Sequence, residues 1–268
     1  MKKIVIFIII LVFLGGGFLA YKKFVKKPST EEKKAVVSKK KPQVNLIDLE
    51  KRPYVTLVPR EDGREVSMTI TKTHFGEDKV EYELEYQAGT MIQGAFGRID
   101  FSEEPLPVTK KLLFGSCSKG KCKYDEDVSG GSLTLYFKGS EDYAVKGEFT
   151  IGQTGEKEGV FSSRDAKISL DVGEKGLSAG TFVIVSSTIG LPEEVEGKVL
   201  AGPVGFFTAN SVKINQATLS FKGINEDLDK VKVLGWVNSQ WQVYEAVKEE
   251  DGISSQVDSL GTFVLVSE

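Results

Sequence analysis

Two cysteines are the residues of this chain whose spacing most clearly favours a defined chemistry. Cys117 and Cys122 are separated by four residues with a central glycine, a loop that can turn back tightly. Such a loop can bring two Cα atoms within the distance that a disulfide requires. A metal site would need further ligands, and redox pairs are usually separated by only two residues. We therefore expect a structural disulfide, with free thiols and metal or redox chemistry as the alternatives.

The other residue types that could perform catalysis are scattered. His74 is the single histidine. Catalysis by a serine or cysteine nucleophile needs a base within hydrogen-bond reach of that nucleophile. A histidine in a turn, without a catalytic role, is the simpler interpretation. Paired carboxylates of the glycosidase kind remain an alternative, because many acidic residues are present. We predict no enzyme, no catalytic residue and no cofactor.

Two acidic turns could offer oxygen ligands to calcium. They are residues 125–127 and 225–229. Neither has the twelve-residue loop with glycine at its sixth position and glutamate at its twelfth. Solvated turns are the expected interpretation, so we assign no metal site and keep calcium binding as the alternative.

An aromatic cluster near the C-terminus is the candidate ligand platform. Trp236 and Trp241 flank a short stretch that is typical of a hairpin turn, and Tyr244 follows closely. Exposed aromatic rings can stack on sugars, yet cross-strand tryptophan pairs also stabilise hairpins. We expect a role in the core or in strand register first, and a platform for a ligand second.

The charge distribution divides the chain into two parts. Residues 1–45 contain eleven lysines and two glutamates, a net charge of +9. The remaining 24 Lys and Arg and 36 Asp and Glu give residues 46–268 a net charge of −12. Because nucleic acids are bound by basic surfaces, an acidic body of this kind predicts no nucleic-acid partner.

The N-terminus predicts a membrane anchor followed by a stalk. Residues 4–21 form an uncharged apolar run of 18 residues, close to the minimum for a spanning helix. The run exceeds a signal-peptide core, and Phe18 does not suit cleavage after Ala20, so a cleaved signal is the alternative. Residues 22–45 are rich in Lys, Pro, Ser and Glu, which indicates a disordered stalk attracted to anionic lipid head groups.

The sequence gives conflicting signals about the side of the membrane on which the body lies. Lysines 22, 23, 26 and 27 outweigh Lys2 and Lys3, a bias that favours a cytoplasmic body. The signal-like start, the cysteine pair and an all-β body favour export. We expect a single-pass protein with an extracytoplasmic body.

The body shows the alternation of apolar and polar residues that is typical of strands with one buried face. Val80, Tyr82, Leu84 and Tyr86 alternate with glutamates, and residues 66–70 repeat the pattern. Glycine-rich turns separate such stretches, as in sandwiches and barrels. Residues 152–159 lack large apolar side chains. We therefore predict an all-β fold of two tandem β-sandwiches: an immunoglobulin-like domain of about seven strands over residues 46–157, and a second sandwich over 158–268.

The second half resembles a known family. It contains a glycine-rich loop (173–180), a Gly-Pro element (200–207), a Trp-bearing hairpin and a closing apolar strand (260–266). This order resembles the β-sandwich of zona occludens proteins and netrin receptors, as found in bacterial surface proteins. Self-cleaving relatives use a His-Phe-Ser type sequence. Here Ser259 and Thr262 lack a neighbouring histidine as general base, so we expect no self-cleavage, in contrast to what the resemblance to those relatives would imply. The first half resembles domains of uncharacterised bacterial membrane-anchored proteins, a resemblance that implies no activity.

These features together lead to one functional expectation. We expect a non-enzymatic, membrane-anchored protein on the cell surface that serves adhesion, protein binding or envelope structure. The alternative is a carbohydrate-binding module that uses the Trp236 and Trp241 hairpin. The expected partners of the chain are the bilayer, anionic head groups and an unidentified protein or glycan.

Overall fold

The computed structural model describes residues 43–155, 159–173, 176–210, 212–224, 226–227 and 230–267. The expected membrane segment (4–21), the stalk up to residue 42 and the expected domain boundary at 157 lie outside the described residues. Within the described ranges the regular structure is β-strand, apart from one short 3-10 helix, Leu49–Lys51. No helix in this part is long and apolar enough to span a membrane.

The strands follow one another along the whole described chain. They are β1 (Tyr54–Pro59), β2 (Glu65–Lys72), β3 (Lys79–Ala88), β4 (Met91–Asp100), β5 (Val108–Leu113), β6 (Gly115–Ser118), β7 (Lys121–Tyr124), β8 (Val128–Lys138), β9 (Tyr143–Gln153), β10 (Val160–Ser162), β11 (Ile168–Asp171), β12 (Phe182–Ser187), β13 (Lys198–Phe207), β14 (Lys213–Lys222), β15 (Val231–Val237), β16 (Gln240–Tyr244), β17 (Val247–Glu249), β18 (Gly252–Ser259) and β19 (Thr262–Ser267). The predicted all-β class is confirmed.

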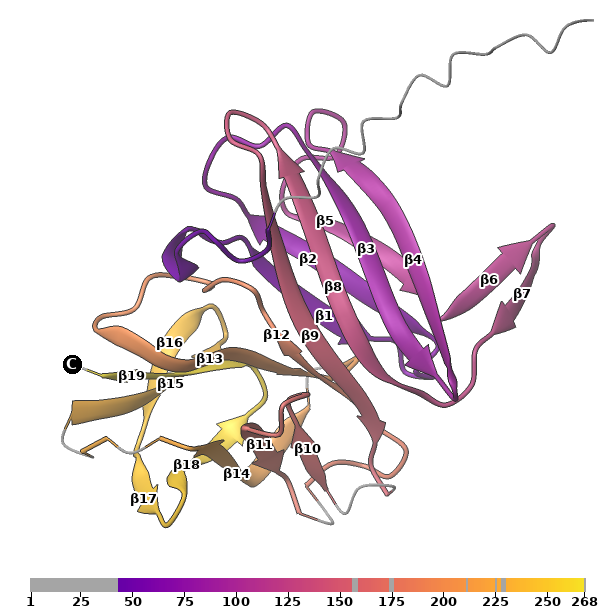
Figure 1. Cartoon of the computed structure of the whole chain (residues 1–268). Helices are drawn as coiled ribbons and strands as arrows, with labels where there is room; N and C mark the ends of the chain where they lie inside the picture. The colour runs from indigo at the N-terminus through magenta and orange to yellow at the C-terminus, as the bar shows by residue number, and fades with distance from the viewer. Residues whose placement is uncertain are drawn as a thin grey trace, which may run out of the picture. The chain divides into compact units, whose positions relative to one another are not determined.

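One long sheet organises these strands. Its order is β16-β15-β19-β13-β12-β9-β8-β3-β4, and every neighbouring pair in it is antiparallel. A three-stranded sheet (β1-β2-β5) and a five-stranded sheet (β10-β11-β14-β18-β17) accompany it. The pair β6-β7 stands apart as a two-stranded hairpin that projects from the body (Figure 1).

The two larger hydrophobic cores lie on opposite faces of the long sheet, and a third, small cluster contains Leu191, Leu234, Val264 and Val266. The first is built from β1, β2 and β5 against β3, β4, β8 and β9; the second is built from the five-stranded sheet against β12, β13, β15 and β19. Strand β12 shows the change of face directly. Ile184 belongs to the first core, whereas Val183 and Val185 belong to the second. Since successive side chains on a strand point to opposite faces, the two smaller sheets cover opposite faces.

The alternation read from the sequence is the cause of this packing. Val66, Met68 and Ile70 are fully buried in β2, as are Val80 and Leu84 in β3. The closing strand β19 lies between β15 and β13 and is buried on both faces, as its continuous apolar run predicts.

The two halves of the chain share hydrogen bonds as well as a linker. Strand β9, before residue 157, pairs with β12, after it, through five residue pairs from Phe182 opposite Gln153 to Ser186 opposite Phe149. Residues 42–268 accordingly form one compact unit. The long sheet therefore runs across the expected division, and Ile184 and Ile189, which follow residue 157, belong to the first core.

Candidate functional site

The β6–β7 hairpin carries the predicted disulfide. Cys117 and Cys122 lie directly opposite each other, with their Cα atoms 4.0 Å apart and their sulfurs bonded. Lys119 and Gly120 form the turn, and both have positive φ angles, 50° and 78°. Two consecutive residues with positive φ match the twist of a tight hairpin. The structural disulfide expected from the sequence is confirmed.

The hairpin has two chemically different faces. Cys122 and Tyr124 point to one side of β7, so Lys121 and Lys123 point to the other. Their cross-strand partners are Ser118 and Ser116, which places two ammonium groups and two hydroxyls on one face. Residues 116–123 are all exposed. Among the described residues, no carboxylate forms an ion pair with the hairpin lysines.

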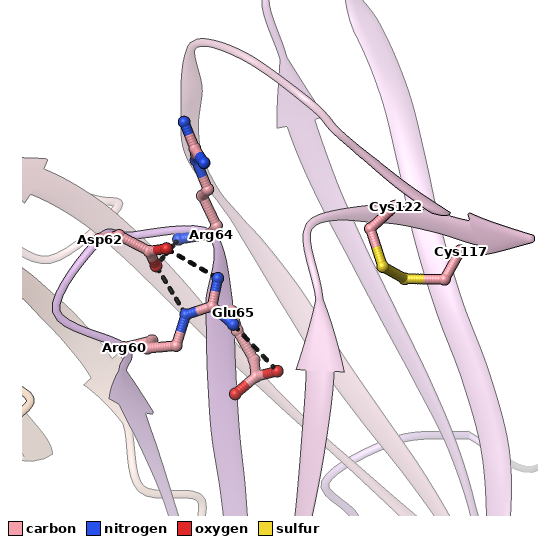
Figure 2. A network of polar contacts seen from close by, with 6 residues as sticks. All are labelled: Arg60, Asp62, Arg64, Glu65, Cys117 and Cys122. Atoms are coloured by element: carbon pink, nitrogen blue, oxygen red, sulfur yellow. Dashed lines mark hydrogen bonds and ion pairs between the residues drawn. A yellow bond between two sulfur atoms is a disulfide. The ribbon is translucent and has the colours of Figure 1, made fainter. Parts of the chain in front are cut away.

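A cationic network from the β1–β2 turn supports the base of the hairpin. Arg60 donates two hydrogen bonds to the Asp62 carboxylate, from Nε to Oδ1 and from Nη2 to Oδ2, both 2.7 Å (Figure 2). The Arg60 guanidinium also lies 3.6 Å from Glu65. The guanidinium groups of Arg60 and Arg64 lie 5.8 and 4.8 Å from the ring centroid of Tyr124. Such cation–π contacts fix the last residue of β7 against the body.

Electrostatics within this network favour its ionised form. The hydrogen bonds from Arg60 hold the pKa of the Asp62 carboxyl below its usual range. The Asp62 carboxylate in turn raises the pKa of Arg60. Asp62 also accepts a hydrogen bond from the Arg64 backbone N–H at 3.1 Å, which closes the turn. The exposed location limits the energy of each pair, so the network orients the hairpin base more than it stabilises the fold.

A second anchor fixes the other side of the hairpin base. The Tyr86 hydroxyl donates to Asp125 Oδ2 at 2.8 Å and accepts from the Gly115 backbone N–H at 2.9 Å. Burial, together with the nearby Asp125 carboxylate, raises the pKa of Tyr86. Gly115 has a φ of 141°, and a Cβ there would lie 2.2 Å from the Lys123 carbonyl oxygen, so glycine is required where the chain turns into the hairpin.

The predicted Trp hairpin forms, with the two tryptophans paired. Trp236 in β15 lies opposite Trp241 in β16, with ring centroids 5.3 Å apart and planes at 68°. The turn residues Asn238 and Ser239 both have positive φ. Both rings are half-buried, and Trp241 Nε1 donates to the Glu194 carbonyl at 3.2 Å. Edge-to-face packing of this kind gives the pair a role in register.

Tyr244 does not join the two tryptophans on one surface. It lies three residues after Trp241 on the same strand, so its ring points to the opposite face. There it packs beside Phe263 of the second core at 6.1 Å, whereas Trp241 packs against Leu234, Val264 and Val266. The three-residue platform is therefore divided between two faces.

Two clefts, of about 520 Å³ and about 630 Å³, lie on the described part of the chain. The second lies beside Trp236. Its walls combine apolar and polar side chains, among them Tyr54, Phe207, Asn210, Trp236, Asn238 and Ser259. In its depth the Tyr54 hydroxyl is hydrogen-bonded to the Thr262 hydroxyl at 2.9 Å.

Of the remaining candidates from the sequence, Asp125 belongs to the hairpin base and His74 lies elsewhere. His74 is exposed in the turn before β3, where its backbone N–H donates to Glu77 at 3.4 Å. In the turn 125–127, Asp125 bonds Tyr86. The turn 225–229 lies partly outside the described residues. Within the described ranges, no three His, Cys, Asp or Glu side chains are arranged to hold a metal ion.

Comparison with known proteins adds no assignment. No protein-family model matches the chain, and a search of curated proteins found no match. The resemblance to the zona occludens and netrin receptor sandwich therefore stays a prediction.

The disulfide should stabilise the hairpin locally. A six-residue loop loses about 2 kcal/mol of stabilisation when its disulfide is removed, in the chain-entropy model. We expect the double variant Cys117→Ser, Cys122→Ser to be cut by trypsin at Lys119 and Lys121 about ten times faster than the wild type. Because hairpin residues 116–123 contribute no buried side chain to either core, the free energy of unfolding measured in urea should fall by no more than about this 2 kcal/mol.

The matched control for this prediction lies within the same hairpin. Ser116→Ala with Ser118→Ala should leave the rate of tryptic cleavage unchanged. A fall of much more than about 2 kcal/mol in the free energy of unfolding of the cysteine variant would instead show that the hairpin supports the two cores.

Proposed function

We propose that this chain is a membrane-anchored, extracytoplasmic, non-enzymatic protein that displays two tandem β-sandwiches for adhesion, protein binding or envelope structure. The first sandwich is immunoglobulin-like and the second is of the zona occludens and netrin receptor type. Residues 4–21 hold the chain in the bilayer, and the Lys-rich stalk contacts anionic head groups. The β6–β7 hairpin is the element that contacts the partner.

The observation that carries the proposal is the exposed, disulfide-closed hairpin with three lysines. Disulfides persist in oxidising compartments, which supports an exported body. The lysines extend from a body with a net charge of −12, so the hairpin is a positive element on an acidic protein. Its rigid base reduces the entropy lost on binding. A partner with carboxylate, sulfate or phosphate groups fits this charge and the neighbouring hydroxyls.

An array of neutral, sulfated and phosphorylated glycans and acidic peptides, probed with the full-length chain, tests the proposal. We expect binding to the anionic members and weaker binding as salt rises. Replacing Lys119, Lys121 and Lys123 with glutamate should weaken it at least about tenfold, since carboxylates that repel the anionic partner then stand in place of the ammonium groups.

A control of equal charge change separates the site from the overall charge. Glutamate at the exposed residues Lys167, Lys198 and Lys222 should leave binding within about twofold of the wild type. Equal losses in the two triple variants, or no anionic binding at all, would contradict the hairpin as the contact element.

The cleft beside Trp236 favours carbohydrate binding as the second candidate. Trp236 and Phe207 offer apolar ring surface, and Asn210 and Asn238 offer amide groups. Sugar sites combine such surfaces with a few polar groups. In the same array, binding to neutral glycans that is lost in Trp236→Ala and kept in the hairpin variant would select this function.

A further inference from the structure

Strand β4 is a long free edge. Within the described part of the chain it pairs with β3 alone and ends the long sheet (Figure 1). The pairing runs without irregularity from Lys79 opposite Asp100 to Ala88 opposite Met91. Free edges are usually protected by proline, lysine or a bulge. Strand β4 contains none of these, so its outward N–H and C=O groups are open to another strand.

This edge also carries exposed apolar side chains. Ile92 and Phe96 are 75% and 85% exposed, whereas Ile99 is buried in the first core. By alternation, Ile92, Gly94, Phe96 and Arg98 share the outer face of the sheet. Large exposed apolar side chains next to unpaired backbone groups are typical of an interaction surface.

The hydrogen-bond ladder determines which residues of β4 can pair outward. Just after the strand, the Phe101 N–H donates to the Asp78 carbonyl at 2.9 Å, toward β3. Because the bonded residues alternate in an antiparallel ladder, the odd-numbered residues of β4 bond to β3. The N–H and C=O groups of Gly94, Phe96 and Arg98 therefore face the open edge.

We propose that a second copy of the chain pairs with β4 in antiparallel fashion, about a twofold axis at Phe96. The two Phe96 residues then lie opposite each other, and Gly94 of each copy lies opposite Arg98 of the other. This register matches the outward groups of both strands and gives about six main-chain hydrogen bonds. It also places the exposed Phe96 rings of the two copies next to each other.

Charge complementarity selects this register. On β3, Glu85 lies opposite Gly94 on the same outer face. In the pair, Arg98 of one copy crosses Gly94 of the second copy, which has no side chain, and reaches Glu85 of that copy. Two strand spacings separate their Cα atoms by about 10 Å, within the combined reach of the two side chains. A shift that places Ala95 on the axis puts Ile92 in the path of Arg98.

The same ion pair does not form within one copy. Arg98 lies opposite Glu81, and Glu85 lies four residues farther along the strand, about 13 Å away. Exchanging the charges of Arg98 and Glu85 by substitution therefore tests the contact between two copies and not a contact within one copy.

Sedimentation equilibrium of the full-length chain in density-matched detergent tests the proposal. We expect a reversible dimer for the wild type and a monomer for Phe96→Lys. Val243→Lys is the matched control, because Val243 is 67% exposed on β16, the opposite edge of the same sheet. This control should dimerise as the wild type does.

The charge exchange tests the register. Arg98→Glu and Glu85→Arg should each weaken dimerisation at least about tenfold, and the double variant should restore it. A monomeric wild type, or dimerisation that persists in Phe96→Lys, would overturn the proposal. A double variant that dimerises no better than the single variants would overturn the Phe96-centred register. Array binding by the hairpin does not depend on this outcome.

Discussion

Phe263→Ala is expected to lower the free energy of unfolding by about 3–5 kcal/mol, because it opens a cavity in the second core. Phe263 is the second residue of β19 and is fully buried. Its ring packs against Phe206 at 6.2 Å and Tyr244 at 6.1 Å, and it covers Gly235 on the neighbouring strand. Urea denaturation followed by tryptophan fluorescence measures the loss.

The control for this substitution is the exposed Val243 of β16. Val243→Ala should change the free energy of unfolding by no more than about 0.5 kcal/mol. A loss below about 1 kcal/mol in Phe263→Ala would mean that β19 is not the central buried strand of the second core.

Tyr143→Phe is expected to destabilise the first core by about 2–3 kcal/mol at neutral pH, because the Tyr143 hydroxyl donates a hydrogen bond to the buried Glu77 carboxylate. Burial alone would raise the pKa of Glu77. The hydrogen bonds from Tyr143 and from the Phe75 backbone N–H outweigh burial and hold that pKa below its ordinary value. The ionised carboxylate therefore contributes to the stability of the folded state.

The pH dependence of this effect follows from the direction of the shift. A depressed folded-state pKa gives stability that is present above the unfolded-state pKa, about 4.3 for glutamate, and is lost as the pH falls through the folded value. The difference between wild type and Tyr143→Phe should therefore shrink below about pH 4.3. Urea denaturation at a series of pH values measures it.

A surface tyrosine provides the control. Tyr136 donates to Glu83 at 3.3 Å on the outer face of the sheet, where water screens the contact. Tyr136→Phe should cost less than about 1 kcal/mol at every pH. A pH-independent loss in Tyr143→Phe would show that packing, and not the Glu77 hydrogen bond, is the cause.

The pattern of apolar residues in the sequence predicted those strands whose apolar side chains are buried. The alternation at Val66, Met68 and Ile70 predicts β2, and the apolar run at 260–266 predicts the central strand β19. Strand β4 gave no such signal, because Ile92 and Phe96 lie on its exposed face and its glycines interrupt the pattern. The link between β9 and β12 depends on which strands meet, a tertiary property that alternation does not encode.

The candidate sites show the same limit. The spacing of Cys117 and Cys122 was sufficient for the disulfide, since both lie in one hairpin. The parity of Trp241 and Tyr244 could have separated them, because residues three apart on a strand point to opposite faces. The support of the hairpin by Arg60 and Tyr124 had no sequence signal, because 64 residues separate the two.

Thiol labelling on intact cells tests the central claim most directly, namely that the chain displays its disulfide hairpin outside the cytoplasm. Cys117 and Cys122 are the only cysteines of the chain, and both are exposed. A membrane-impermeant maleimide should label the full-length protein only after a membrane-impermeant reductant is added to the intact cells. Labelling without a reductant, or labelling that appears only after the cells are lysed, would contradict the account.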